Sequence, residues 1–298
     1  MNVDGVFAGG GVKAFAFIGA LQVMEESGYT FSRLAGTSAG AIFASLIRAG
    51  YTSEELLTML DDLDIKKFKD AGMSIVLFPF AKWLRLYYRL GMYSGVKLEQ
   101  WLSQALKEKG ISTFADLPVD SLKIIASDIS RGRLIVLPDD LPDYGINPQS
   151  FSIAHAVRMS CSVPYFFEPV KLYNRKKGGE RSYVVDGGIL SNFPLWVFSG
   201  ERDGTLRRPV LGFQLKPELD EIPPNEIKNA IDLYQSLFVT MRQAHDLRYI
   251  SKKHAKNIVF IPVDNVTSTD FNLDQEQKKV LIELGRQETA RFLHSWSY

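Results

Sequence analysis

The first 50 residues show the same pattern twice: a short apolar run, a glycine-rich turn, and a segment with helical periodicity. The two turns are Gly9-Gly10-Gly11 and Gly36-Thr37-Ser38-Ala39-Gly40, and the two helical segments stop at Gly28 and Gly50. Strand, turn and helix in this order form βαβ units, whose parallel strands are covered by helices on both faces. We therefore predict an α/β fold, a three-layer α/β/α domain around a mainly parallel central sheet.

The remaining chain adds strands and helices without an evident linker. Strand-like runs occur at 122–126 and 134–137 around the turn Ser130-Arg131-Gly132, and again at 183–185, 210–215 and 258–263. Helical patterns cover most of 53–115, and 153–160, 225–253 and 273–294, with Asn272 and Gln275 as the capping box of the last helix. We predict a single domain over 1–298, with a helical insertion at about 53–115 and a helical C-terminal region at about 218–298.

The bulk composition limits the partners and the location that we expect. The 298 residues include 35 basic and 34 acidic side chains, so the chain is almost neutral and its charge does not indicate a nucleic-acid partner. The single Cys161 excludes an intramolecular disulfide and fits a reducing compartment. Because the N-terminus lacks a basic leader and charged residues interrupt the apolar stretch near 73–90, we predict a cytoplasmic protein without a signal peptide or spanning helix. The composition gives no indication of the oligomeric state.

The turn around Ser38 has the form Gly36-x-Ser38-x-Gly40 between a strand and a helix, which is typical of a nucleophile elbow. The backbone of an elbow turns so tightly that Cβ atoms two residues before and after the serine would collide with the neighbouring strand and helix. The turn also exposes the serine hydroxyl beside the first amides of the next helix. Ser38 is therefore the candidate nucleophile. The alternative is a glycine turn that only packs a helix on the sheet.

The first glycine turn, Gly9-Gly10-Gly11-Val12-Lys13, has consecutive backbone amides that can converge on one point ahead of a helix. Such a nest can hold a phosphate or a developing oxyanion. A dinucleotide fingerprint would need a third glycine where this chain has Ala14, and an acidic residue at the end of the second strand. Nucleotide binding is therefore the second interpretation of this loop, and a plain strand-to-helix turn is the third.

The third glycine segment, Asp186-Gly187-Gly188, follows a short strand. An aspartate at the carboxyl end of a strand can point into the same crevice as Ser38 and remove the serine proton, which a weak nucleophile requires. The alternative is an aspartate that only accepts hydrogen bonds from amides of its own turn.

A Ser-Asp-His triad in this chain order would need a histidine on a short loop after Asp186. His245, His254 and His294 fall within or at the ends of predicted helices, and His155 precedes the aspartate. This distribution favours a Ser-Asp pair. No His/Cys/Asp cluster has metal-ligand spacing, so we expect no metal and no cofactor.

Taken together, the three glycine segments resemble the signatures of patatin-like phospholipases, in the same order and at similar separations. Residues 156–164 are similar to the family's A-x-R-A-S-x-A-x-P segment, and Asn192-Phe193-Pro194 is similar to the segment after its aspartate. The resemblance covers roughly residues 5–200. Two departures are that Ala14 replaces the last glycine of the family's G-x-G-x-x-G and that residues beyond 200 match no family motif.

The resemblance implies a serine acyl-hydrolase that cleaves fatty-acyl esters of lipids, phospholipase- or lysophospholipase-like, through a dyad of Ser38 and Asp186. It implies an oxyanion hole from the amides of the glycine loop and the residue after the nucleophile: Gly9, Gly10, Gly11, Val12 and Ala39. The supporting motif residues are Lys13, Gly36, Gly40, Gly187 and Gly188. Because some family members are poor hydrolases, the alternative is a catalytically weak lipid-binding or regulatory protein with the same fold.

A peripheral membrane contact is a further hypothesis, through about 75–90. Lys82, Arg85 and Arg89 share one helical face amid aromatic and leucine side chains, as an interfacial helix requires. The alternative is that this segment packs on the core, which is more common for apolar runs of this kind.

Overall fold

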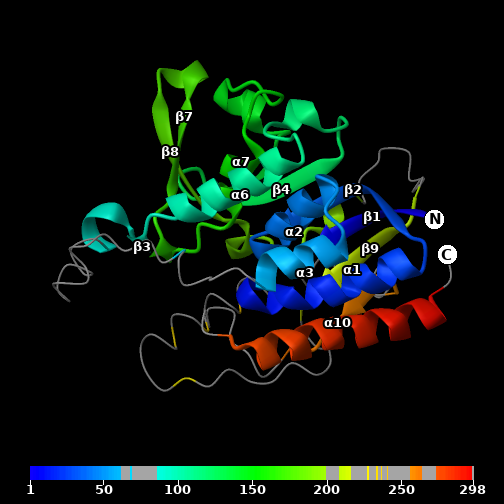
Figure 1. The fold of residues 1–298 in the computed structure, drawn as a ribbon. Coiled ribbons are helices and arrows are strands. Elements are labelled where there is room, and N and C mark those ends of the chain that lie inside the picture. The colour runs from blue at the N-terminus through cyan, green and yellow to red at the C-terminus, as the bar shows by residue number, and fades with distance from the viewer. Residues whose placement is uncertain are drawn as a thin grey trace.

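A mixed β-sheet forms the centre of the fold (Figure 1). The structure is a computed structural model, and it describes residues 1–61, 86–198, 208–215, 256–263 and 273–296, with Phe68, Ile227, Leu233, Ser236 and Thr240. In these residues, eight strands form the central sheet: β1 (Asn2–Phe7), β2 (Thr30–Thr37), β4 (Leu122–Asp128), β5 (Arg133–Leu137), β7 (Val170–Asn174), β8 (Glu180–Asp186), β9 (Val210–Gln214) and β10 (Ile258–Phe260). Their order is β10-β9-β1-β2-β4-β8-β7, and β5 pairs with β4.

Most neighbouring strands are parallel, as the sequence predicts. The run β10-β9-β1-β2-β4 is parallel throughout, whereas β5 and β8 are antiparallel to β4 and β7 is antiparallel to β8. A second, two-stranded sheet joins β3 (Gly91–Tyr93) to β6 (Tyr165–Phe167). The sequence did not predict β3, β6 or β7.

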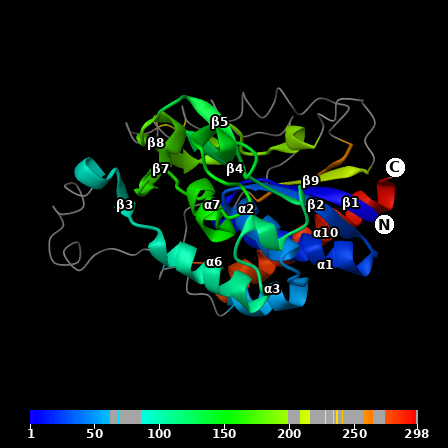
Figure 2. The same ribbon diagram turned by 90° about the horizontal axis from the view of Figure 1, so that it is seen from above.

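The α-helices in the described parts of the chain cover one face of the sheet (Figure 2). They are α1 (Ala16–Glu26), α2 (Ala39–Arg48), α3 (Ser53–Asp61), α6 (Val96–Glu108), α7 (Ile153–Ser160) and α10 (Gln275–Ser295). The main hydrophobic core lies between these helices and the strands. A second cluster on the sheet packs Val6, Ala35 and Val210 against the segment with Phe193, Leu195 and Phe198, which includes the 3-10 turn η7 (Leu195–Val197).

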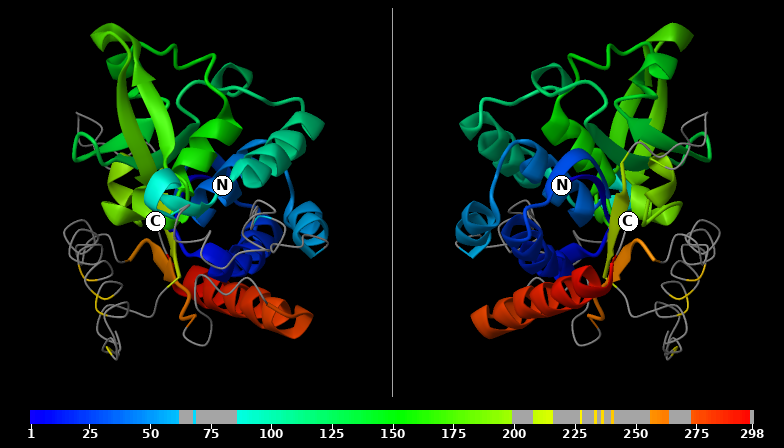
Figure 3. Two further views of the ribbon diagram at one scale, coloured as in Figure 1. Left: turned by 90° about the vertical axis from the view of Figure 1, so that its left-hand side faces the viewer. Right: turned by 90° about the vertical axis from the view of Figure 1, so that its right-hand side faces the viewer.

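The outermost elements lie on opposite sides of the molecule. The β7–β8 hairpin projects on one side, and α10 packs along α1 on the other (Figures 1 and 3). No helix in the described parts of the chain combines the length and apolar character needed to cross a membrane.

The two strands that carry Ser38 and Asp186 share one edge of β4. Residues Leu122–Ile125 of β4 pair with β2, and the next three residues, Ala126 to Asp128, pair with β8. The opposite edge of β4 is taken by β5. Because β2 is parallel to β4 and β8 is antiparallel, the carboxyl ends of β2 and β8 meet end to end. Thr37 lies opposite Ile125, and Asp186 lies opposite the next residue, Ala126.

Some predictions differ from the structure in detail. The last helix is capped by Asp274, whose side chain accepts from the amide of Gln277, and not by Asn272 with Gln275. The helix expected from residue 14 begins as a 3-10 turn, η1 (Gly11–Phe15), that leads into α1. The described residues of 53–115 include the helices α3 and α6 and also the short strand β3, which was not predicted. The helix expected at 225–253 lies almost wholly outside the described residues.

Candidate active site

The elbow at Ser38 connects β2 directly to α2. Ser38 has φ +54° and ψ −126°, a conformation that non-glycine residues rarely adopt and that is associated with strained functional turns. A Cβ atom at Gly36 would lie 2.3 Å from the carbonyl oxygen of Gly40, and one at Gly40 would lie 2.3 Å from that of Phe7. These contacts are the collisions that the sequence pattern predicts, since one is with the helix start and the other with the neighbouring strand.

The glycine loop after β1 faces the same elbow. Gly11 has φ +57°, which glycine adopts without strain. The amide of Lys13 donates to the carbonyl of Gly10 at 3.2 Å and closes the first turn of η1. The amides of Gly10, Gly11 and Val12 precede that bond, so they have no intrahelical acceptor. A Cβ atom at Gly9 would lie 3.2 Å from that of Ser38, which shows how closely the loop approaches the serine.

Asn192 holds the glycine loop at Gly9. The amide of Gly9 donates to the Asn192 carbonyl at 3.0 Å, and the Asn192 side-chain Nδ2 donates to the Gly9 carbonyl at 3.0 Å. The Asn192 side-chain oxygen also sits 3.0 Å from the position of a Cβ atom at Gly188. Asn192 thus joins the glycine loop to the aspartate loop, a role that the sequence pattern around it did not reveal.

Asp186 is the last residue of β8 and is 6% exposed. Its Oδ1 accepts from the amide of Gly188 at 2.7 Å, so the local hydrogen bond expected of a turn aspartate is present. Gly187 is required by the end-to-end junction, because a Cβ atom there would lie 2.3 Å from the carbonyl oxygen of Ile125 in β4. One carboxylate oxygen is thereby held by the turn while the side chain lines the same pocket as Ser38.

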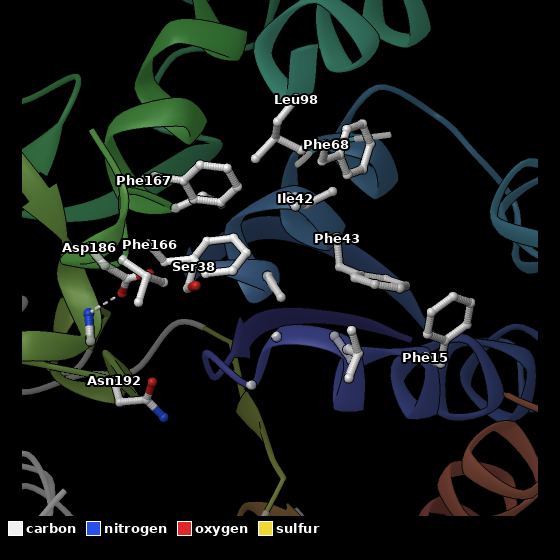
Figure 4. Close-up of a pocket in the computed structure, with 18 of the residues that line it drawn as sticks. Phe15, Ser38, Ile42, Phe43, Phe68, Leu98, Phe166, Phe167, Asp186 and Asn192 are labelled. Carbon is white, nitrogen blue, oxygen red and sulfur yellow. Dashed lines mark hydrogen bonds between the residues drawn. The ribbon is translucent and has the colours of Figure 1, made fainter. Parts of the chain in front are cut away.

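A pocket of about 300 Å³ opens beside Ser38 and Asp186. Figure 4 shows these two residues at one end of it, with Phe15 and Phe68 at the other. Most of its lining is apolar: Val12, Phe15, Ile42, Phe43, Leu60, Phe68, Leu98, Trp101, Val163, Pro164, Phe166, Phe167 and Ile189. Among the described lining residues, the polar side chains are those of Ser38, Asp186 and Asn192, apart from the Cys161 thiol. This arrangement suits an apolar chain whose polar end lies at Ser38.

Cys161 lines the pocket but is not suited to act as its nucleophile. Burial raises the pKa of the Cys161 thiol well above its usual range, and the nearby charge of Asp186 raises it further. Because the thiolate is the reactive form, this thiol remains protonated and inert near neutral pH.

Other charged and histidine side chains that the sequence analysis considered do not line the pocket where the structure describes them. Lys13 donates to the carbonyl of Val263 at 2.6 Å and is absent from the pocket lining. His155 contacts Glu99 on α6, with 3.0 Å between Nδ1 and Oε1, and His294 lies in the last turn of α10. His245 and His254 lie outside the described residues, as do Lys82 and Arg85 of the predicted interfacial helix. In its described part, Tyr87 and Tyr88 are exposed.

A further contact at the elbow comes from Ser160, the last residue of α7. The amide of Ser38 donates to Ser160 Oγ at 2.8 Å, and this hydroxyl donates to the carbonyl of Ile125 at 2.6 Å. Ser160 belongs to the 156–164 segment that resembles a known family, but the sequence alone gave it no role.

Comparisons with known proteins show which family this chain resembles. The family model for patatin-like phospholipase matches residues 5–199. The uncharacterized protein YqhO of Bacillus subtilis is 50% identical over 298 residues, which is the full length of both chains. The triacylglycerol lipase ptl3 of Schizosaccharomyces pombe is 27% identical over 202 residues, which cover 66% of this chain and 39% of the lipase.

The solved structures support the three-layer α/β/α fold. The structure of VipD from Legionella pneumophila matches 99% of this chain and 67% of its own chain, with a TM-score of 0.58 and 19% identity. The family and its lipase relatives support lipid acyl-hydrolase activity in general. Since the family model spans well over half of the chain and includes all three glycine segments, this protein belongs to the patatin-like phospholipase family.

Proposed function

We propose that this protein hydrolyses fatty-acyl esters of lipids, with Ser38 as the nucleophile and Asp186 as the general base. The observation that carries the proposal is the end-to-end junction of β2 and β8 on one edge of β4. That junction brings a serine in a strained elbow and a buried aspartate to the same end of an apolar pocket. The lipase named among the relatives acts on an ester of the same chemical class.

In the acylation step, the Asp186 carboxylate takes the hydroxyl proton as Ser38 Oγ forms a bond to the acyl carbon. The electron pair of the C=O double bond moves to its oxygen, which becomes the oxyanion of a tetrahedral intermediate. When the intermediate collapses, the ester C–O bond breaks and the alcohol leaves with the proton from Asp186. A water molecule then repeats the sequence on the acyl-serine and releases the fatty acid.

The oxyanion is stabilised by amides from two chain segments. Gly10, Gly11 and Val12 precede the first bond of η1, and Ala39 lies in the first turn of α2, where amides also lack an intrahelical acceptor. The amide of Gly9 is not part of this set, because it donates to the Asn192 carbonyl. Amides aimed at the developing charge usually supply the largest single contribution to such a reaction, and losing one costs about 3–4 kcal/mol of barrier.

The decisive experiment is labelling with a fluorophosphonate and mapping of the labelled residue by mass spectrometry. We expect a single adduct on Ser38, and none in the folded Ser38→Ala variant, which should also lose hydrolysis of a soluble short-chain ester. Label on another residue, or unchanged hydrolysis by Ser38→Ala, would contradict the proposal. A wild-type protein that binds lipid but takes no label would favour the catalytically weak lipid-binding protein instead.

A further inference from the structure

Ser160 makes two hydrogen bonds whose directions can be assigned without ambiguity. Its side chain is fully buried, and its Oγ lies 2.8 Å from the amide nitrogen of Ser38 and 2.6 Å from the carbonyl oxygen of Ile125. A hydroxyl has one proton to donate, and a carbonyl oxygen can only accept. The Ser160 proton therefore goes to Ile125, and the Ser160 oxygen accepts the amide proton of Ser38.

This accepted bond acts on the residue that carries the strain. Ser38 holds φ +54°, and the orientation of its amide determines where its Cα–Cβ bond points. By accepting the amide proton, Ser160 favours the one orientation of the Thr37–Ser38 peptide that aims the hydroxyl into the pocket. Without the acceptor, this partly buried amide would lose the hydrogen bond that it makes in this conformation, which disfavours the elbow.

The donated bond ends where the two strands of the site meet. Ile125 lies opposite Thr37 in the β2–β4 register, and the next residue of β4 lies opposite Asp186. The Ile125 carbonyl is also the atom against which Gly187 packs. Ser160 thus ties the elbow of Ser38 to the point of β4 that sets the position of Asp186.

Other contacts hold the helix that carries Ser160. The α7 helix begins with a cap, in which Ser152 Oγ accepts from the amide of His155. Near its end, Arg158 is buried and donates to the carbonyls of Ser94 and Glu168. The helix is therefore held by contacts other than those of the Ser160 hydroxyl, which joins the elbow to β4.

We propose that Ser160 is a positioning residue for the nucleophile, acting through the backbone amide of Ser38. The inference rests on the proposed function, because it assigns Ser160 a role in the reactivity of Ser38. Ser160 does not touch the substrate, so its loss should lower the rate of the chemical step while leaving substrate binding nearly unchanged.

The test compares Ser160→Ala and Ser160→Cys with the wild-type protein. We expect Ser160→Ala to lower both kcat on a short-chain ester and the rate of fluorophosphonate labelling by about 10- to 100-fold, with KM little changed. The thiol of Ser160→Cys fills the same space but is a weak donor and acceptor, so this variant should resemble Ser160→Ala. If Ser160→Ala does not fold, Ser160→Cys carries the same test.

The matched control is Ser45→Ala. Ser45 is another buried serine, but it donates within α2 to the carbonyl of Ile42 and does not contact the elbow. This variant should label at the wild-type rate. Labelling of Ser160→Ala at the wild-type rate would overturn the inference, and so would a wild-type rate in Ser160→Cys, since Ser160 would then only fill space. A wild-type protein that takes no label at Ser38 refutes the proposed function itself, so the two failures are distinguishable.

Discussion

Replacing Gly40 by alanine tests whether the elbow and the glycine loop must touch for the reaction to occur. Gly40 is the second residue of α2, and its Cα faces the end of β1. An added Cβ would lie 2.3 Å from the carbonyl oxygen of Phe7 and 2.6 Å from that of Ala8. Both atoms belong to backbone that leads into the glycine loop, so neither can rotate away as a side chain would.

The expected loss of catalysis and of stability follows from the distance by which α2 must move away from β1. Ordinary contact begins at 3.4 Å, so α2 must move away from β1 by about 1 Å. A misplacement of about 1 Å can reduce catalysis by about 100-fold. Alanine in a helix interior stabilises by up to about 1 kcal/mol relative to glycine, whereas overpacking costs about 1–3 kcal/mol. We therefore expect Gly40→Ala to be destabilised by about 1–2 kcal/mol, because the clash outweighs the gain in helix propensity.

The assay measures the melting temperature and the rate of fluorophosphonate labelling in the same preparation. The matched control is Gly285→Ala on α10, where an added Cβ would meet the carbonyl oxygen of Ala16 at 1.9 Å. Both variants should melt lower than the wild-type protein, but only Gly40→Ala should lose labelling by a large factor. Equal labelling of Gly40→Ala and wild type would refute the reasoning, since contact between elbow and loop would then be irrelevant to Ser38.

Four further substitutions probe other parts of the structure. Asp186→Asn keeps an oxygen for the Gly188 amide but cannot take a proton, so the rate of hydrolysis should fall by about 100-fold or more. His155→Ala should retain most of the wild-type rate. The reverse result for these two variants would indicate a triad. In Gly10→Ala the added Cβ would press only on the flexible end of a leucine side chain. This variant should lower kcat by about tenfold or more with little change in KM. If ATP or NAD raised the melting temperature of the wild-type protein, the glycine loop would instead be a nucleotide site. Tyr144→Phe removes a buried 2.7 Å bond to Asp128 and should cost about 1–3 kcal/mol in chemical denaturation at neutral pH. Burial and the Asp128 hydrogen bond raise the pKa of Tyr144 to about 12. The folded protein therefore keeps the phenol proton above pH ~10, where the unfolded chain loses it. Between pH ~10 and ~12 the stability of the wild-type protein should fall more steeply than that of Tyr144→Phe.

The parts of the site that the sequence predicted are those that a local segment determines by itself. The elbow needs small residues at 36 and 40, and the glycine loop needs a residue that accepts φ +57° at position 11. Each requirement is met within a few residues, so the pattern is visible in the chain. The strand with Asp186 was equally visible, because the apolar run 183–185 is followed by the aspartate and then by two glycines.

The parts that were missed depend on pairing between distant segments. No local pattern shows that β8 is antiparallel to β4 or that it shares an edge with β2, yet this pairing brings Asp186 to Ser38. The roles of Asn192 and Ser160 likewise exist only once Gly9 and Ile125 lie beside them. The wrongly predicted cap of α10 has a different cause.

The start of α10 shows why that error arose. Asn272 with Gln275 and Asp274 with Gln277 both have the spacing of a capping box, so the pattern alone cannot choose between them. The structure has the second pair, with both of its reciprocal hydrogen bonds at 3.0 Å or less. A capping pattern therefore limits a helix start to a few residues, and its tertiary setting decides which of them is used.

The glycines of the motifs explain why a local pattern could point to a site built by distant segments. Cβ atoms at Gly36, Gly40 and Gly187 would each lie 2.3 Å from a backbone carbonyl oxygen, respectively in α2, at the end of β1 and in β4. Each glycine therefore marks a place where backbone approaches backbone more closely than any side chain permits. These three close approaches lie at the carboxyl ends of β1, β2 and β8, where the glycine loop, Ser38 and Asp186 line the same pocket. The motif residues are constrained by tertiary contacts, and this is why a short sequence pattern carries information about the assembled site.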